Sequence, residues 1–320
     1  MKAFLIGAFV VGAGLFVTRA QQSPAPAALH TFHVQGNVHM ISGAGGNVTV
    51  QIGNDGILLV DTGLAANADA LLAEVRKLSK APIRYVINTH VHPDHVGGNE
   101  KFFLAGSTIT GGNVTGDIGD AGTGAAIIAH EGVLNRMSAP TGTQSTYPQK
   151  AWPNDTYFTK EKKLFFNGEA ILIMHAPAAH TDGDSIVFFR KSDVLSAGDI
   201  YVTTSFPIVD LKTGGNIQGI LNAINRMIDI MVPADKQEGG TYVIPGHGRV
   251  ADQADLVEYR DMITIIRDRI ADSVKKGLTL DQVKASKPTL DYDGVYSKPG
   301  SFWSADQFIS AVYANLTAKK

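Results

Sequence analysis

The sequence predicts an α/β fold, because strand patterns and amphipathic helix patterns both recur along its 320 residues. Alternating apolar and polar residues over 31–60 are typical of short β-strands. Apolar side chains at three- and four-residue spacing over 68–78, 216–231 and 254–274 are typical of helices that bury one face. Several apolar runs also end in histidine or aspartate, which indicates that polar side chains collect at the ends of buried strands.

Residues 1–20 have the pattern of a secretory signal peptide. Lys2 precedes an apolar stretch over 3–17, and residues 18–20 supply the small side chains of a cleavage site. The apolar stretch is shorter than the ~20 residues of a membrane-spanning helix. Residues 21–28 are rich in Pro and Ala and are expected to form a linker. We therefore expect a periplasmic or secreted protein, with an uncleaved N-terminal anchor as the alternative.

The composition excludes several kinds of site. The chain has no Cys, so disulfide bonds, a lipid-modified Cys and thiolate metal ligands are excluded. Removal of Lys2 and Arg19 with the signal peptide leaves 26 of the 28 basic residues against 30 acidic ones, a net charge of −4. Because no basic cluster stands out, we expect no nucleic-acid partner and no stable membrane association after cleavage. A small-molecule substrate is expected, and the oligomeric state is left open.

Residues 89–99 (THVHPDHVGGN) place four metal-capable side chains within six positions. They follow the apolar run 83–88, which predicts a buried strand. In extended backbone, residues i and i+2 point to the same side, so His90 and His92 can hold one ion together.

Pro93 suits the first turn of a helix, because it lacks an N–H and has a helical φ. That turn directs Asp94 and His95 away from the first pair of histidines. The spacing therefore predicts two neighbouring metal ions rather than one four-ligand site.

Two further segments of the first half are predicted with different roles. Residues 124–137 (GAAIIAHEGVLNRM) are expected to form a helix, in which His130 is a packing or network residue. Residues 138–155 are rich in Pro, Thr, Gln and Gly and predict a long loop. Such a loop either borders an active site or only joins the two halves of the chain.

The second half repeats the pattern of apolar strands that end in polar residues. A hairpin is predicted over 163–174 around Asn167 and Gly168. Asp199 ends an apolar run, where a buried carboxylate costs several kcal/mol unless it is paired or binds a metal. His180 and His247 also follow apolar runs. All of these side chains are therefore expected at one edge of the sheets.

The His90-x-His92-x-Asp94-His95 pattern resembles the HxHxDH signature of the metallo-β-lactamase superfamily. The resemblance covers about residues 32–249. It implies a four-layer αββα sandwich of the α/β (α+β) class, with the metals at one edge between the sheets. We place this domain at 29–275 and expect residues 276–320 to be a helical extension packed on it.

The resemblance also implies the metal ligands and their supporting residues. The first site would consist of His90, His92 and His180, the second of Asp94, His95 and His247, with Asp199 bridging the two ions. His175 competes with His180 for the third position of the first site, and we favour His180.

Two further roles follow from the same resemblance. Asp61, in a DTG sequence, would accept a hydrogen bond from a metal-bound histidine ring. Tyr201 is a candidate for the tyrosine that binds the substrate carbonyl in lactonases.

Imidazole and carboxylate ligands suit two Zn²⁺ ions, and the oxygen ligand Asp199 also permits iron or manganese. The expected reaction is attack of a metal-bridging hydroxide on a carbonyl carbon, with Asp94 holding and receiving the proton. Because Asp stands where zinc-thiolate β-lactamases have Cys, the ligand set is more similar to lactonases and to thioesterases of the glyoxalase II type.

The expected function is therefore zinc-dependent hydrolysis of a cyclic amide or ester, of the β-lactam or lactone type, outside the cytoplasm. Three alternatives stay open. They are a thioester hydrolase of the glyoxalase II type, an iron persulfide dioxygenase with a single metal, and a metal-dependent binding module without catalysis.

Overall fold

The structure of the chain is a computed structural model that describes residues 28–108, 123–141, 144–236, 239–298 and 303–318. The predicted signal peptide (1–20) and nearly all of the predicted linker (21–28) lie outside the described residues. Within these residues, no helix has the length and apolar character needed to cross a membrane.

A seven-stranded sheet contains most of the first half of the chain, in the order β1-β2-β3-β4-β5-β6-β9. Neighbouring strands are antiparallel from β1 to β4 and parallel from β4 through β9. Its strands are β1 (His30–Gln35), β2 (Val38–Ser42), β3 (Val48–Gly53), β4 (Gly56–Val60), β5 (Ile83–Ile87), β6 (Ala126–His130) and β9 (Asp155–Tyr157). The parallel arrangement brings the carboxyl ends of β4, β5 and β6 to one edge, where the HxHxDH segment begins.

A five-stranded sheet contains the second half, in the order β10-β11-β12-β13-β14. Its strands are β10 (Glu161–Phe166), β11 (Glu169–Ala176), β12 (Asp184–Phe189), β13 (Val194–Ser196) and β14 (Tyr242–Ile244). The predicted hairpin is present between β10 and β11, and Asn167 and Gly168 both have positive φ, at 50° and 76°. This conformation is the one that an Asn-Gly hairpin turn requires.

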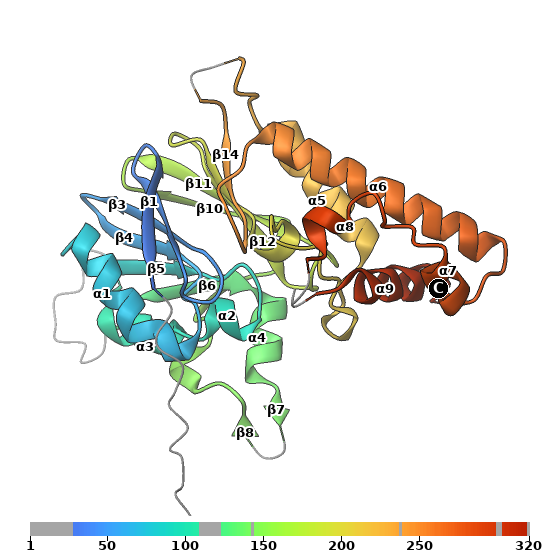
Figure 1. Ribbon diagram of the computed structural model, residues 1–320. Helices are drawn as coiled ribbons and strands as arrows, with labels where there is room; N and C mark the ends of the chain where they lie inside the picture. The colour runs from blue at the N-terminus through green and yellow to red at the C-terminus, as the bar shows by residue number, and fades with distance from the viewer. Residues whose placement is uncertain (1–27, 109–122, 142–143, 237–238, 299–302, 319–320) are drawn as a thin grey trace, which may run out of the picture.

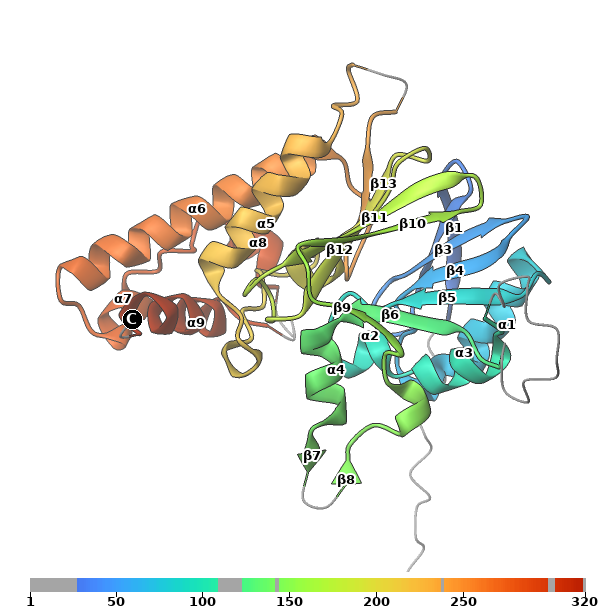
Figure 2. The same cartoon turned by 180° about the vertical axis from the view of Figure 1, so that it is seen from behind.

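Helices cover the outer face of each sheet, as both views show (Figures 1 and 2). The first sheet is covered by α1 (Ala68–Leu78) and α3 (Asn99–Ala105), whose buried Leu71, Val75 and Phe102 pack against strand residues such as Leu59. The second sheet is covered by α5 (Ile217–Ile230) and α6 (Gln253–Lys275).

The space between the two sheets is filled by apolar side chains from both. Leu58 and Ile87 of the first sheet belong to the same buried cluster as Ile173, Val187 and Phe189 of the second. Each such residue contributes about 1.5–3 kcal/mol when it is fully buried. The architecture is the predicted four-layer αββα sandwich.

The C-terminal segment adds α7 (Leu280–Ala285), α8 (Asp293–Tyr296) and α9 (Ala305–Thr317). Val283 of α7 and Phe308 and Val312 of α9 are buried in the cluster that also holds the apolar faces of α5 and α6. Capping boxes at Thr279 and Ser304 fix where α7 and α9 begin. These helices therefore extend the outer layer of the second sheet.

The predicted helix over 124–137 is wrong in its first part. Residues 126–130 form β6, which pairs in parallel with β5 and β9, and α4 (Glu131–Ser138) begins only after His130. Ile127 and Ile128 are both fully buried, one on each face of the sheet. A short apolar run does not distinguish a strand from a helix, and here the pairing with two neighbouring strands decides.

Candidate metal centre

The HxHxDH segment adopts the local geometry that its sequence predicts. After β5 the chain enters an extended loop that carries His90 and His92, and α2 (Pro93–Val96) begins with proline in its first turn. His92 has extended backbone angles (φ −66°, ψ 146°), and Asp94 and His95 lie in the following helical turn. The change from extended to helical backbone separates the two pairs of side chains.

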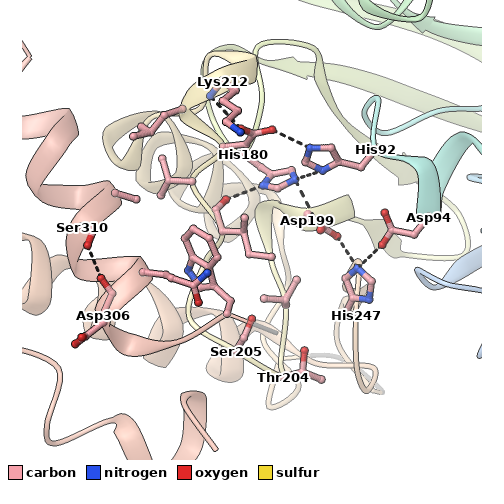
Figure 3. Close-up of a pocket in the computed structure, with 18 of the residues that line it drawn as sticks. His92, Asp94, His180, Asp199, Thr204, Ser205, Lys212, His247, Asp306 and Ser310 are labelled. Carbon is pink, nitrogen blue, oxygen red and sulfur yellow. Dashed lines mark hydrogen bonds and ion pairs between the residues drawn. The ribbon is translucent and has the colours of Figure 1, made fainter. Parts of the chain in front are cut away.

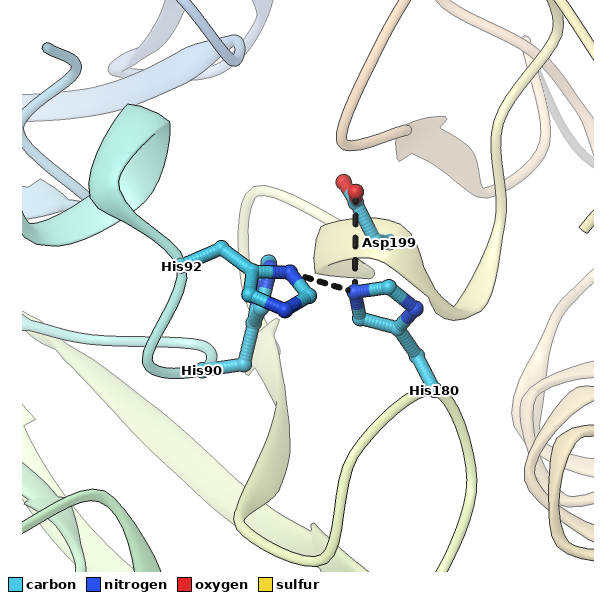
Figure 4. A group of neighbouring side chains, drawn as sticks. All are labelled: His90, His92, His180 and Asp199. Carbon is cyan, nitrogen blue, oxygen red and sulfur yellow. Dashed lines mark hydrogen bonds and ion pairs between the residues drawn. The ribbon is translucent and has the colours of Figure 1, made fainter. Parts of the chain in front are cut away.

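Two groups of metal-capable side chains lie side by side. One consists of His90, His92, His180 and Asp199, drawn in Figure 4, and the other of Asp94, His95 and His247. Within each group the candidate ligand atoms lie within 4.8 Å of one another. The seven residues are the seven that the sequence predicts.

Asp199 lies between the two groups. Its Oδ1 is 3.2 Å from His95 Nε2 and 3.4 Å from His247 Nε2, and its Oδ2 is 3.7 Å from His180 Nε2. One carboxylate oxygen therefore faces each group, as a bridging ligand requires. The backbone makes room for it at Gly246, where a Cβ atom would lie 1.9 Å from Asp199 Oδ1.

In the first group, hydrogen bonds to the far side of each ring assign its tautomer. His180 Nδ1 donates to the carbonyl of Ile208 at 2.6 Å, and His92 Nε2 donates to Asp210 Oδ2 at 2.9 Å. The lone pairs of His180 Nε2 and His92 Nδ1 then face each other at 2.9 Å. Two facing lone pairs repel unless a cation lies beside them, so this arrangement fits a metal ion.

Asp61 supports both groups through the residue pair Thr89 and His95. Its carboxylate accepts hydrogen bonds from Thr89 N at 2.8 Å, Thr89 Oγ1 at 2.7 Å and His95 Nδ1 at 2.8 Å. Since the Thr89 hydroxyl donates to Asp61, it accepts from His90 Nδ1 at 2.9 Å. The nitrogen that each of the two rings leaves for a metal is therefore Nε2. The hydrogen bond predicted between Asp61 and the ring of a candidate ligand is thus present, at His95.

Three buried polar atoms of this centre have no hydrogen-bond partner: His90 Nε2, His95 Nε2 and Asp199 Oδ1. Such atoms normally cost about 1–3 kcal/mol each when unsatisfied. All three belong to residues of the predicted ligand set. Imidazole nitrogens and a carboxylate are ligands that divalent transition metals prefer, so the residues present fit such ions.

The electrostatic environment differs between the two groups. Burial, together with neighbouring histidines, lowers the pKa of His90 well below its usual value, and burial lowers the pKa of His180 to about 4. Burial also lowers the pKa of His95 and His247, but nearby carboxylates outweigh it. They hold the pKa of His95 well above its usual value and raise the pKa of His247 to about 9.

The pKa values of both carboxylates of the centre, Asp199 and Asp94, are lowered. Burial raises the pKa of Asp199 and of Asp94, but His95 and His247 outweigh it and hold both values below the usual one. Both carboxylates are therefore ionised at neutral pH and available as metal ligands.

A cavity of ≈1210 Å³ opens from the metal centre toward the C-terminal helices. Figure 3 shows Asp306 and Ser310 of α9 across the cavity from His92, Asp94 and His247. Its apolar wall residues are Leu64, Val202, Ile208, Val209, Leu211, Trp303 and Ala311. The cavity is therefore large and mainly apolar, with the metal ligands at one end.

Two sequence candidates, Tyr201 and His175, lie outside this site. Tyr201 is 3% exposed, packs edge-on against Tyr259 at 5.0 Å between ring centroids, and is not among the cavity-lining residues. This position gives no support to the predicted contact with a substrate carbonyl. His175 donates through Nε2 to the carbonyl of Asp182 and stacks on His130 at 3.6 Å, so it points away from both ligand groups.

The described residues of the long segment 138–155 pack against Val91, in the loop between His90 and His92, and do not line the cavity. The segment contains β7 (Pro140–Thr141) and β8 (Gln144–Ser145) among its described residues. Tyr147 Oη donates to the carbonyl of Val91 at 3.3 Å. Tyr147 and Trp152 also pack against a small apolar cluster that contains Val91 and Val96.

Sequence reasoning missed Asp210, which orients His92 from 118 residues away. Trp303 both packs against the core cluster of the C-terminal helices and lines the cavity. The segment around Asp210 (FPIVDLKTGG) carries no metal-ligand spacing that would have identified it.

Comparison with known proteins agrees with this geometry. The sequence profile of the metallo-beta-lactamase superfamily matches residues 42–247. A linear primary-alkylsulfatase from Pseudomonas sp. (strain ATCC 19151) is 24% identical over 272 residues, which cover 72% of this chain and 47% of the relative.

Solved structures show the same fold at low identity. A stereoselective inverting sec-alkylsulfatase from Pseudomonas sp. has a TM-score of 0.65 at 18% identity, over 90% of this chain and 50% of that one. A metallo-beta-lactamase from Pontibacter korlensis has a TM-score of 0.53 at 17% identity, over 74% of this chain and 99% of that one. The chain thus spans about half the length of the alkylsulfatases that it matches.

The family profile covers more than half of the chain and includes every residue of the two ligand groups. The chain therefore belongs to the metallo-β-lactamase superfamily, and its His/Asp centre is of the kind that binds divalent metal ions.

Proposed function

We propose that this protein is a dinuclear zinc hydrolase that opens a cyclic ester or amide, of the lactone or β-lactam type, carrying a long apolar substituent. The observation that carries the proposal is the juxtaposition of the two ligand groups with the large apolar cavity. We further propose that the substrate is met outside the cytoplasm, as the N-terminal sequence predicts.

Divalent ions bound here would supply Lewis acidity and lower the pKa of water toward ~7. The protein's own contribution is to fix the ligands and handle the proton. Asp94 Oδ2 lies 3.1 Å from His247 Nε2 and its side chain is 31% exposed toward the cavity. Asp94 is thus placed to accept a proton when water is activated and to pass it to the leaving atom.

The second ligand group supports two ions over one. A single-iron persulfide dioxygenase, the oxidoreductase alternative, needs only two His and one Asp. Here Asp94, His95 and His247 form a complete second group beside the first. A thioester is a third acyl substrate compatible with the same chemistry, and it belongs in any substrate test.

A sulfate ester of a long-chain alcohol is the second candidate substrate. The likeness to the sec-alkylsulfatase structure covers 90% of this chain, against 74% for the metallo-beta-lactamase structure. The mainly apolar lining of the cavity would suit the alkyl chain of such a substrate. The reacting atom would then be sulfur or an alkyl carbon instead of a carbonyl carbon.

The test is hydrolysis by the zinc-loaded protein of a chromogenic β-lactam, short- and long-chain acyl lactones, an acyl thioester and a long-chain alkyl sulfate, each with and without chelator. We expect chelator-sensitive opening of a lactone or β-lactam. Each further buried methylene contributes about 0.8 kcal/mol, so kcat/KM should rise about fourfold per methylene. Release of sulfate without lactone or lactam opening would instead establish the second candidate.

A matched pair of variants tests the apolar cavity. Leu211 lines the cavity and is 44% exposed, whereas Leu290 is 61% exposed and lies outside it. We expect Leu211→Ala to reduce kcat/KM several-fold for the long-chain substrate only, and Leu290→Ala to change neither substrate. Equal loss for short and long chains would contradict the proposed chain-binding wall.

A further inference from the structure

The segment 208–215 contacts two of the three histidines in the first ligand group. The carbonyl of Ile208 accepts from His180 Nδ1 at 2.6 Å, and Asp210 Oδ2 accepts from His92 Nε2 at 2.9 Å. In addition, Asp210 N donates to the carbonyl of His180 at 3.1 Å. One short stretch of chain therefore holds both rings from their far sides.

This stretch is itself held in a tight turn. The other oxygen of Asp210, Oδ1, accepts from Lys212 N at 3.0 Å and caps the short 3-10 helix η4 (Leu211–Thr213). The carbonyl of Asp210 accepts from Gly215 N at 2.8 Å. At Gly215, a Cβ atom would lie 2.3 Å from the carbonyl of His180, so only glycine allows this close approach.

The same stretch forms one wall of the cavity. Five consecutive residues, 208–212, line it, and Figure 3 shows Lys212 at the same end of the cavity as His92 and His180. Leu211 and Lys212, which follow Asp210 directly, are exposed to the cavity. The orientation of the metal-binding rings and the shape of the wall thus depend on one turn.

We propose that Asp210 is a positioning residue that joins the metal centre to the substrate wall. Its Oδ2 holds the proton of His92 on Nε2 and leaves Nδ1 for the metal, while its Oδ1 holds the turn that presents Leu211 and Lys212. The two oxygens of the Asp210 carboxylate thus have different partners, His92 and Lys212. Occupation of the first group by metal therefore stabilises the wall, and an ordered wall strengthens metal binding.

Replacement by asparagine separates this role from a purely structural one. Asn caps helices as well as Asp does, so Asp210→Asn keeps the turn. The amide, however, has only one acceptor oxygen, which Lys212 N occupies, and it presents its NH₂ group to His92. The ring then places its proton on Nδ1, the nitrogen that faces the metal.

The experiment measures Co²⁺ and Zn²⁺ affinity of the full chain by equilibrium dialysis, together with the tautomer of His92 by ¹⁵N NMR. In Asp210→Asn we expect one of two ions to bind about 10–100-fold more weakly, the His92 proton to move to Nδ1, and the melting temperature of the metal-free protein to stay close to wild type. Asp252→Asn, at the capping aspartate of α6, is the matched control and should leave metal affinity unchanged.

Hydrogen exchange of the segment 208–215 completes the test. We expect added Zn²⁺ to slow exchange in the wild-type segment and to have a smaller effect in Asp210→Asn. Wild-type metal affinity in Asp210→Asn, or exchange that does not respond to metal, would overturn the proposal. These readouts need no substrate, so the inference can stand if the proposed lactone or β-lactam activity fails, although its consequence for substrate binding rests on that function.

Discussion

The two ligand groups differ in what holds their rings. In the first group, His90 and His180 are fully buried and bond to a hydroxyl and a backbone carbonyl, and their pKa values are lowered. In the second group, His95 and His247 lie against carboxylates, and their pKa values are raised. His90 and His180 are therefore neutral and ready for a metal ion, whereas His95 and His247 bind protons that a metal ion must displace.

Asp199 is shared by the two groups, so its removal should have the largest effect. In Asp199→Asn we expect both ions to bind more weakly. Loss of a residue that only hydrogen-bonds to a metal ligand lowers activity by up to roughly 100-fold, and we expect a larger loss of kcat/KM here. Metal content after dialysis and hydrolysis of the best substrate are the measurements. Loss of only one ion would show that Asp199 belongs to one group and does not bridge.

The choice between two histidines tests the composition of the first group. His180→Ala should lose one ion and most activity, because His180 Nε2 faces His92 Nδ1 and Asp199. His175→Ala should keep its metal, because His175 bonds to the carbonyl of Asp182 and stacks on His130. Metal stoichiometry of the two purified variants decides, and the reverse result would exchange their roles.

The pH dependence of metal binding should distinguish the groups directly. His247, whose pKa is raised to about 9, is protonated between pH 6 and 8 without metal, and the pKa of His95 is raised as well. The ion in the second group must therefore displace protons, and it binds more tightly as the pH rises. The ion in the first group meets neutral His90 and His180 and should show little pH dependence. Calorimetric titration in buffers of different ionisation enthalpy counts the protons. Equal release for both ions would contradict the comparison.

The smallest effect is expected at His130, which lies outside both ligand groups. Its protonation should change only the free energy of unfolding. Burial, with the neighbouring His175, lowers the pKa of His130 to about 4, and its neutral Nδ1 accepts from Gly132 N at 3.2 Å. An unfolded histidine binds its proton near pH 6.5. Between pH 6.5 and 4 the unfolded chain therefore binds more protons here, and the free energy of unfolding falls as the pH is lowered, by at most about 1.4 kcal/mol per pH unit.

His130→Asn removes this titration and keeps a cap for Gly132 N–H. We expect its free energy of unfolding to fall less than that of wild type between pH 7 and pH 5, measured by denaturant titration. His30→Asn, at an exposed position, is the control. A His130→Asn variant with the wild-type pH dependence would refute the assignment.

Much of the metal centre could be predicted because its chemistry is local in sequence. The extended pair His90 and His92, the proline that begins α2, and the helical turn with Asp94 and His95 depend on backbone conformations set by a few neighbouring residues. Apolar strands that end in His180, Asp199 and His247 predicted their position at one sheet edge. The error over 124–137 has the opposite cause, since only pairing with β5 and β9 makes residues 126–130 a strand.

The sequence by itself determined the α/β class and the division of the HxHxDH side chains into two pairs, since side-chain chemistry and hydrophobic periodicity are properties of the chain, and its resemblance to the superfamily implied the layered fold. The tertiary structure alone decided that Asp210 orients His92, that Tyr201 packs in the core, and that α7 and α9 close the cavity. Those contacts join residues far apart in sequence. They depend on how the layers pack together, and no local pattern in the chain records that packing.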